Sequence, residues 1–80
     1  MILLEKKFRI YMGKKFVIET LWINDGCNVR VYLDKHPLKM VTYEFSTKYN
    51  AYHKALDLLH FGDIHEAYES IMDLCQTTEE

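Results

Sequence analysis

Cysteine, proline and glycine are scarce in this chain of 80 residues, and each scarcity excludes a class of protein. The only two cysteines, Cys27 and Cys75, are far apart, whereas small secreted scaffolds held together by disulfides usually carry four or more. One proline and three isolated glycines exclude a flexible linker, a low-complexity segment and a glycine-rich phosphate loop. No apolar run approaches the roughly 20 residues of a membrane-spanning helix, and charged residues 5–7 interrupt any signal peptide. We therefore expect a reduced, soluble, cytoplasmic protein with no membrane partner.

Apolar and aromatic residues are plentiful, at 49% and 14% of the chain. Disordered chains are poor in both, so this composition predicts a packed globule. The length fits one domain and leaves little room for a deep substrate pocket.

Residues 6–45 alternate between apolar and polar side chains as β-strands do. Gly13 marks a tight turn, and Asn24-Asp25-Gly26 is the strongest hairpin signal in the chain. The strand between these turns is apolar on both faces apart from Glu19 and Thr20, so we expect it at the centre of a sheet. All connections are short, which favours an antiparallel meander. The expected strands are residues 6–12, 16–23, 27–34 and 38–45.

From Ser46 onward the apolar residues recur with a helical period. Ser46 or Thr47 is suited to begin a helix as its N-cap, and Gly62 to end it in a left-handed conformation. In the first helix we expect one apolar stripe made of Tyr49, Tyr52, Leu56 and Leu59. In the second helix we expect the buried residues to be Ile64, Ala67, Tyr68, Ile71 and Cys75.

These patterns predict an α+β fold in a single domain that spans residues 1–80. A four-stranded antiparallel meander over about residues 6–45 is followed by a two-helix hairpin over about residues 46–76. The hairpin packs on one sheet face and leaves the other exposed, and residues 77–80 form an acidic tail.

The segment from Leu58 to Tyr68 resembles the helix-turn-helix of a tetratricopeptide repeat. It has Gly62-Asp63 at the turn, followed by the helical sequence Glu66-Ala67-Tyr68. Such repeats need several stacked copies for stability, and this chain has one. The resemblance therefore implies only that two antiparallel helices are joined here, and no function follows from it.

Four histidines raise the question of a metal site. His53, Asp57 and His60 share a flank of the first helix at a spacing that suits a divalent ion, if a second element supplies another ligand. The established zinc spacings are absent, so we expect no metal and no cofactor. No local signature joins cysteine, histidine and aspartate into a nucleophilic site, so we also expect no catalytic residues and no enzyme activity.

Basic and aromatic residues interleave on the expected strands. Arg9 and Tyr11 on the first strand are predicted to lie near Arg30 and Tyr32 on the third, on the exposed sheet face. Cations and rings on an open sheet can grip phosphates and stack bases. These four residues therefore form a candidate nucleic-acid-binding site.

The near-neutral net charge of −2 conceals two halves of opposite sign. Residues 1–40 contain eight Lys/Arg and four Asp/Glu, a net +4, whereas residues 41–80 contain two and eight, a net −6. Lys and Arg are absent from Ala55 to the end. On the second helix Glu66, Glu69 and Asp73 fall within one narrow arc opposite the apolar stripe, and Asp63 precedes them. Acids near the C-terminal end of a helix oppose its dipole, which suggests a role other than helix stability.

We therefore expect a small non-catalytic inhibitor or regulator that binds a larger protein. Asp63, Glu66, Glu69 and Asp73 would dock on a basic surface, such as the nucleic-acid-binding surface of another protein. Compact acidic domains of this size are typical of phage-encoded host-takeover and anti-defence inhibitors, including anti-CRISPR proteins. A nucleic-acid-binding module that uses Arg9, Tyr11, Arg30 and Tyr32 is the alternative. A homodimer formed through an exposed strand edge or sheet face is a third.

Overall fold

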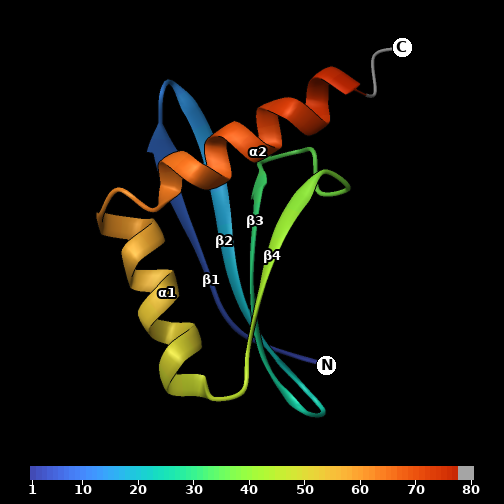
Figure 1. The fold of residues 1–80 in the computed structure, drawn as a ribbon, viewed down its shortest axis with the longest axis vertical. Coiled ribbons are helices and arrows are strands. Elements are labelled where there is room, and N and C mark those ends of the chain that lie inside the picture. The colour runs from blue at the N-terminus through green and yellow to red at the C-terminus, as the bar shows by residue number, and fades with distance from the viewer. Residues whose placement is uncertain (78–80) are drawn as a thin grey trace.

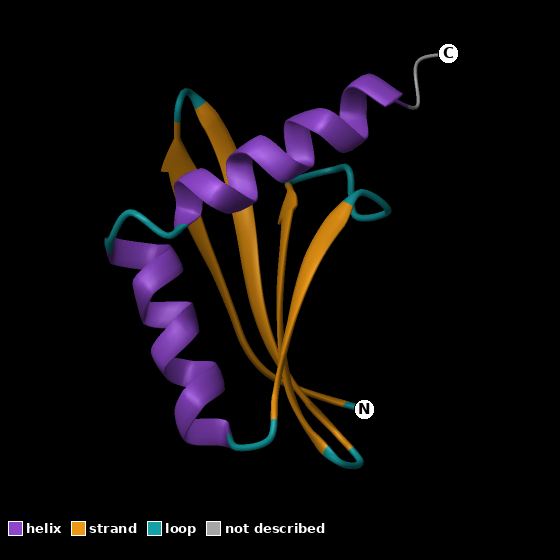
Figure 2. Cartoon of the chain, in the orientation of Figure 1, coloured by secondary structure: helices purple, strands orange, loops and turns teal. Residues whose placement is uncertain are grey.

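The structure, a computed structural model, describes residues 1–77 and confirms the predicted α+β fold. Four antiparallel strands are followed by two helices that pack on one face of the sheet (Figures 1 and 2). The acidic tail predicted for residues 77–80 lies, from residue 78 on, outside the described residues. The elements are β1 (Ile2–Tyr11), β2 (Lys14–Ile23), β3 (Gly26–Leu33), β4 (Met40–Phe45), α1 (Lys48–His60) and α2 (Ile64–Thr77).

The strands follow one another across the sheet in the order β1-β2-β3-β4, as expected of a meander. Met12 and Gly13 have φ angles of 53° and 75°, so the β1–β2 turn has both central residues in the left-handed region, as a type I′ hairpin requires. The β2–β3 hairpin closes at Asn24-Asp25, between the paired residues Ile23 and Gly26. β1 begins earlier than predicted, at Ile2, because its apolar start pairs with the end of β2.

The core lies between the sheet and the helices. β2 and β3 are the central strands, and β2 is buried on both faces over Phe16, Val17 and Ile18. Small residues on the helices meet the β-branched residues of the strands, which brings the two layers close together. The buried core cluster consists of Phe16, Ile18, Cys27, Val29, Val31, Ala51, Ala55, Leu58, Ile64, Ala67 and Ile71.

The two helices differ in how well the sequence predicts their buried side. In α2 the prediction is confirmed for Ile64, Ala67 and Ile71, which are fully buried. Tyr68 and Cys75, predicted with them, are only partly buried. In α1 the predicted stripe is wrong, because Tyr49 and Leu56 are 73% and 51% exposed. The residues of α1 that are buried are Ala51, Ala55 and Leu58. A helix in close contact with a sheet buries its small side chains, and the larger aromatic and aliphatic ones are displaced to its flank.

α1 begins with a side-chain N-cap and ends at a residue with extended backbone. At its start the Thr47 side chain accepts a hydrogen bond from the Asn50 backbone N–H, which confirms the second of the two N-caps considered. At its end Phe61 is extended, and Gly62 is not left-handed as predicted. α2 then runs across the strands at a steep angle to α1 (Figure 1), so the two helices form a corner. The antiparallel pair implied by the repeat resemblance is therefore not formed.

Gly26 is required by the close approach of β3 to the end of β4. A Cβ at this position would collide with the backbone carbonyl oxygen of Phe45, which cannot rotate away. We expect Gly26→Ala to lower the free energy of unfolding by about 2 kcal/mol in urea denaturation. Gly62→Ala is the matched control, because a Cβ there meets no atom within 4 Å. Equal stability of the two variants would contradict the proposed contact.

Thr20 has a buried hydroxyl group, and within residues 1–77 its Oγ1 has no hydrogen-bond partner. The side chain is 1% exposed and faces the core, beside Ile18 and Val29. We expect Thr20→Val to raise the free energy of unfolding by about 1 kcal/mol, because valine has the same shape and no polar atom to desolvate. Thr42→Val, at an exposed position of β4, should change stability little in the same measurement. A loss of stability in Thr20→Val would show that the hydroxyl is satisfied.

Candidate functional site

The acidic residues of α2 lie together on the solvent side of the helix. Glu66, Glu69 and Asp73 are exposed, whereas Ile64, Ala67 and Ile71 of the same helix are buried. Residues spaced three or four apart in the sequence lie on the same side of a helix, because a helical turn has 3.6 residues. We call Glu66, Glu69 and Asp73 the acidic row.

Glu66 and Glu69 contact residues of the sheet layer or of their own helix. The Tyr43 hydroxyl donates a long hydrogen bond of 3.5 Å to Glu66 Oε1. Glu69 Oε2 lies 3.4 Å from His65 Nε2, and the Tyr11 hydroxyl hydrogen-bonds to His65 Nδ1 at 2.7 Å. His65 and Glu69 are about half and two-thirds exposed, so solvent screens this pair. These contacts leave the carboxylates of Glu66 and Glu69 at the surface.

Asp63 occupies a different place from the acidic row. Its Oδ2 is 2.9 Å from Lys54 Nζ, and only 18% of the Lys54 side chain is exposed. The same ammonium group lies 4.4 Å from the centre of the Tyr43 ring. Asp63 therefore holds the α1–α2 corner together, and its charge is largely compensated by Lys54.

The two lysines of α1 have contacts outside the acidic row. Lys54 is engaged at the corner, and Lys48 lies 5.1 Å from the centre of the Trp22 ring on β2. α2 itself contains neither Lys nor Arg. The carboxylates of α2 therefore have no lysine or arginine neighbour on their own helix.

Tyr43 links the acidic row to the sheet as a neutral hydrogen-bond donor. Burial, together with the neighbouring carboxylates of Glu66 and Asp63, raises the pKa of Tyr43 to about 12. The phenol therefore keeps its proton throughout the physiological pH range and can go on donating to Glu66.

The predicted nucleic-acid-binding set is divided between the two faces of the sheet. Arg9 pairs with Phe16 of the helix-covered face, while Tyr32 pairs with Val17 of the open face. The prediction that Arg9, Tyr11, Arg30 and Tyr32 share an exposed face is therefore wrong. Alternation along β1 and β3 was assigned correctly, but alternation alone does not fix which set of residues faces the helices.

On the helix-covered face, Arg9 and Tyr11 have structural partners. Arg9 Nη1 donates to the carbonyl oxygens of Leu58 and Phe61, each at 2.7 Å, at the C-terminal end of α1. Tyr11 contacts Tyr68 edge to face, with ring centres 5.7 Å apart. A cation at a helix C-terminus satisfies carbonyl groups left without intrahelical donors and interacts favourably with the dipole.

On the open face, Arg30 and Tyr32 do not form a base-stacking platform. Tyr32 is 8% exposed, and its hydroxyl donates to Glu19 Oε2 at 2.8 Å. Burial and Glu19 raise the pKa of Tyr32 to about 12, so this hydrogen bond persists at neutral pH. Arg30 Nη2 lies 3.1 Å from the Met1 sulfur. Stacking of a base would require an exposed ring, which Tyr32 does not offer.

The histidines of α1 do not form a metal site with Asp57 in residues 1–77. His53 Nδ1 lies 3.9 Å from Asp57 Oδ2, and both side chains are exposed. Within residues 1–77 no three His, Cys, Asp or Glu residues are placed to hold a metal ion together. The same part of the chain contains no helix of the length and apolarity needed to cross a membrane.

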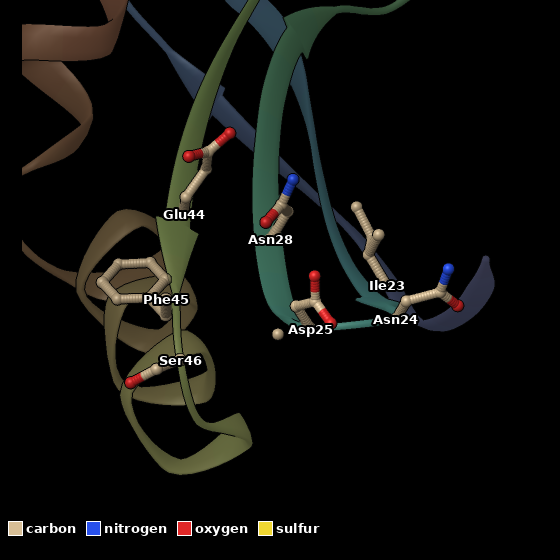
Figure 3. Close-up of a pocket in the computed structure, with 8 residues that line it drawn as sticks. Ile23, Asn24, Asp25, Asn28, Glu44, Phe45 and Ser46 are labelled. Atoms are coloured by element: carbon tan, nitrogen blue, oxygen red, sulfur yellow. The ribbon is translucent and has the colours of Figure 1, made fainter.

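An open groove lies at the end of the sheet away from α2, a feature that the sequence reasoning missed. Figure 3 shows Glu44 and Asn28 on neighbouring strands, with Asp25 and Asn24 at the β2–β3 turn below them. The groove forms where Gly26, without a side chain, meets Phe45 and Ser46. Its two carboxylates are a second acidic feature, separate from the acidic row.

Comparison with known proteins gives no assignment: no protein-family model, no curated protein and no solved structure matches this chain.

Proposed function

We propose that this protein is a small non-catalytic inhibitor or regulator that docks the acidic row of α2 on a basic surface of a larger protein. The observation that carries the proposal is the exposure of Glu66, Glu69 and Asp73 on one side of a helix that contains neither Lys nor Arg. Opposite charge accelerates association and favours one orientation of docking.

The spacing of the acidic row suits a surface that normally holds nucleic acid. From Glu66 to Asp73 the helix rises by about 10 Å, at 1.5 Å per residue. One strand of DNA advances 3.4 Å per nucleotide, so the row spans about three nucleotides. Occupation of such a surface would exclude nucleic acid from it. Phage-encoded anti-defence and host-takeover inhibitors act in this way, and the small size and acidic helical layer support that kind of role here.

The proposal is tested by capture of partners from a lysate with matched baits. The wild-type chain and the Glu66→Lys/Asp73→Lys variant are immobilised, and the bound proteins are identified by mass spectrometry. We expect a protein with a basic nucleic-acid-binding surface to bind the first bait and not the second. Capture of the same partner by both baits would contradict docking through α2. Retention of RNA or DNA by the purified chain, weakening as salt rises, would favour the nucleic-acid-binding alternative instead.

A further inference from the structure

β1 is a long edge strand with an uncovered outer side. It has ten residues and pairs only with β2, and no other strand within residues 1–77 reaches it. The opposite edge, β4, has six residues. A row of backbone N–H and C=O groups on a long edge is a template for pairing with another strand.

Apolar side chains gather along this edge on the open face of the sheet. Phe8 and Ile10 are 48% and 67% exposed, and Leu3 is half exposed. Six of the eleven large apolar side chains that are exposed within the described residues belong to residues 1–12. The middle of β1 is charged and its pairing is irregular between Leu3 and Glu5, two features that blunt an edge strand. Apolar side chains on both sides of this segment nevertheless stay exposed, and an exposed apolar patch marks an interaction site.

The helical layer adds an apolar flank to the same edge. Lys54 on one flank of α1 contacts Tyr43 of β4, so the other flank is turned toward β1. Lys48 on that second flank lies over Trp22, the neighbour of Ile2 in the sheet. This flank also carries Leu56, which is 51% exposed, and the half-buried Tyr52 and Leu59. Figure 1 shows α1 alongside β1 at this edge of the sheet.

The charges in the middle of β1 are complementary to those of a second, antiparallel copy of β1. Glu5 and Lys7 pair with Thr20 and Ile18, so both lie on the helix-covered face, and they are 3.9 Å apart within the strand. In an antiparallel pair of β1 strands centred on Lys6, Glu5 faces Lys7 of the second copy, and the reverse pair forms across the axis. In a two-fold symmetric dimer both subunits use the same surface patch, so that patch must be complementary to itself.

We propose that two copies of this chain associate through β1, in antiparallel register about Lys6, to form a continuous eight-stranded sheet. The pairing of β1 shifts by one residue between Leu3 and Glu5, and with the same shift in the new pair Phe8 of each copy lies opposite Leu3 of the other on the open face, which covers both side chains. The apolar flanks of the two α1 helices meet above the new strand pair. The two Lys6 side chains oppose each other at the axis and weaken the association.

A strand from another protein or a nucleic acid fits the β1 edge less well than a second copy of this chain does. A strand of uniformly acidic or basic character would match either Glu5 or Lys7 and repel the other. A nucleic acid would gain no stacking on Tyr32, which is buried and bound to Glu19. Only a strand with the same charge order satisfies both Glu5 and Lys7.

The test is the concentration dependence of molar mass, measured by sedimentation equilibrium from micromolar to millimolar chain. We expect a monomer–dimer equilibrium that Lys7→Glu weakens about tenfold, because both cross-strand pairs become repulsive. The Glu5→Lys/Lys7→Glu double variant should restore dimerisation, since it exchanges the two charges. Lys6→Thr should tighten the dimer by removing the repulsion at the axis. Lys39→Glu, a charge reversal outside β1, should leave the dissociation constant unchanged.

Hydrogen exchange gives a readout on the unmodified chain. Amides of residues 2–11 should exchange more slowly as the chain concentration rises, while those of β4 should not change. A wild-type chain that stays monomeric at millimolar concentration would overturn the proposal. A dimer that responds equally to Lys7→Glu and Lys39→Glu, or that the double variant fails to restore, would overturn it as well.

Discussion

Replacing Arg9 by glutamine is expected to lower the free energy of unfolding by about 3 kcal/mol. Its guanidinium group donates two hydrogen bonds of 2.7 Å to carbonyl oxygens at the end of α1, from a strand about fifty positions away. Charge-assisted hydrogen bonds contribute about 1.5–3 kcal/mol each when formed away from water, and partial exposure reduces that value here. Without them, α1 loses its main polar connection to β1.

Urea denaturation followed by circular dichroism measures this effect, and two variants serve as controls. Arg30→Gln removes an arginine from the open face, where its guanidinium group contacts the Met1 sulfur, and should cost much less. Arg9→Lys keeps the positive charge at the helix end but lacks the planar fork, so its stability should be intermediate. Equal losses in Arg9→Gln and Arg30→Gln would show that Arg9 does not secure the end of α1.

Reversal of Glu66 and Asp73 to lysine is expected to weaken binding to the captured partner by at least about 100-fold, or about 2.7 kcal/mol. Each substitution replaces an attraction to a basic surface with a repulsion, and both positions are exposed, so the fold should remain intact. Surface charge also controls encounter, so most of the loss at low salt should be in the association rate. Isothermal titration and surface plasmon resonance give the affinity and the two rates.

Glu44→Lys is the matched control for this reversal. Glu44 is exposed and acidic, but it lines the groove on the open side of the sheet, away from α2. It should leave the affinity within about threefold of the wild type, since a remote exposed charge contributes little. Asp63→Lys is a poorer probe, because it breaks the 2.9 Å pair with Lys54 and so disturbs the corner as well as the charge. A common loss in all variants would point to net charge rather than to docking through the acidic row.

The sheet could be predicted from the sequence because its signals are local. Glycine-containing turns and alternating side chains define the two hairpins, and short connections allow few topologies. The buried side of α2 could also be predicted from the sequence, because its apolar residues are confined to one arc of the helix. In both cases the information lies within a few adjacent residues.

The position of α1 and the role of Arg9 could not be predicted, because both depend on contacts between distant segments. Large side chains such as Tyr49 and Leu56 carry the strongest apolar signal in α1, yet Ala51 and Ala55 face the sheet. Periodicity does not distinguish a helix that packs closely through small residues from one that packs through large ones. For β1, alternation placed Arg9 and Tyr11 together, but only the helices determine which face is covered.

The central claim, that the acidic row competes with nucleic acid for a basic surface, is tested most directly by a displacement titration. The captured partner is loaded with fluorescently labelled nucleic acid, and the release of label is followed as the chain is added. We expect the wild-type chain and Glu44→Lys to displace the label, and Glu66→Lys/Asp73→Lys to fail at the same concentrations. A ternary complex that retains the label, or equal displacement by the reversed variant, would contradict the proposed function.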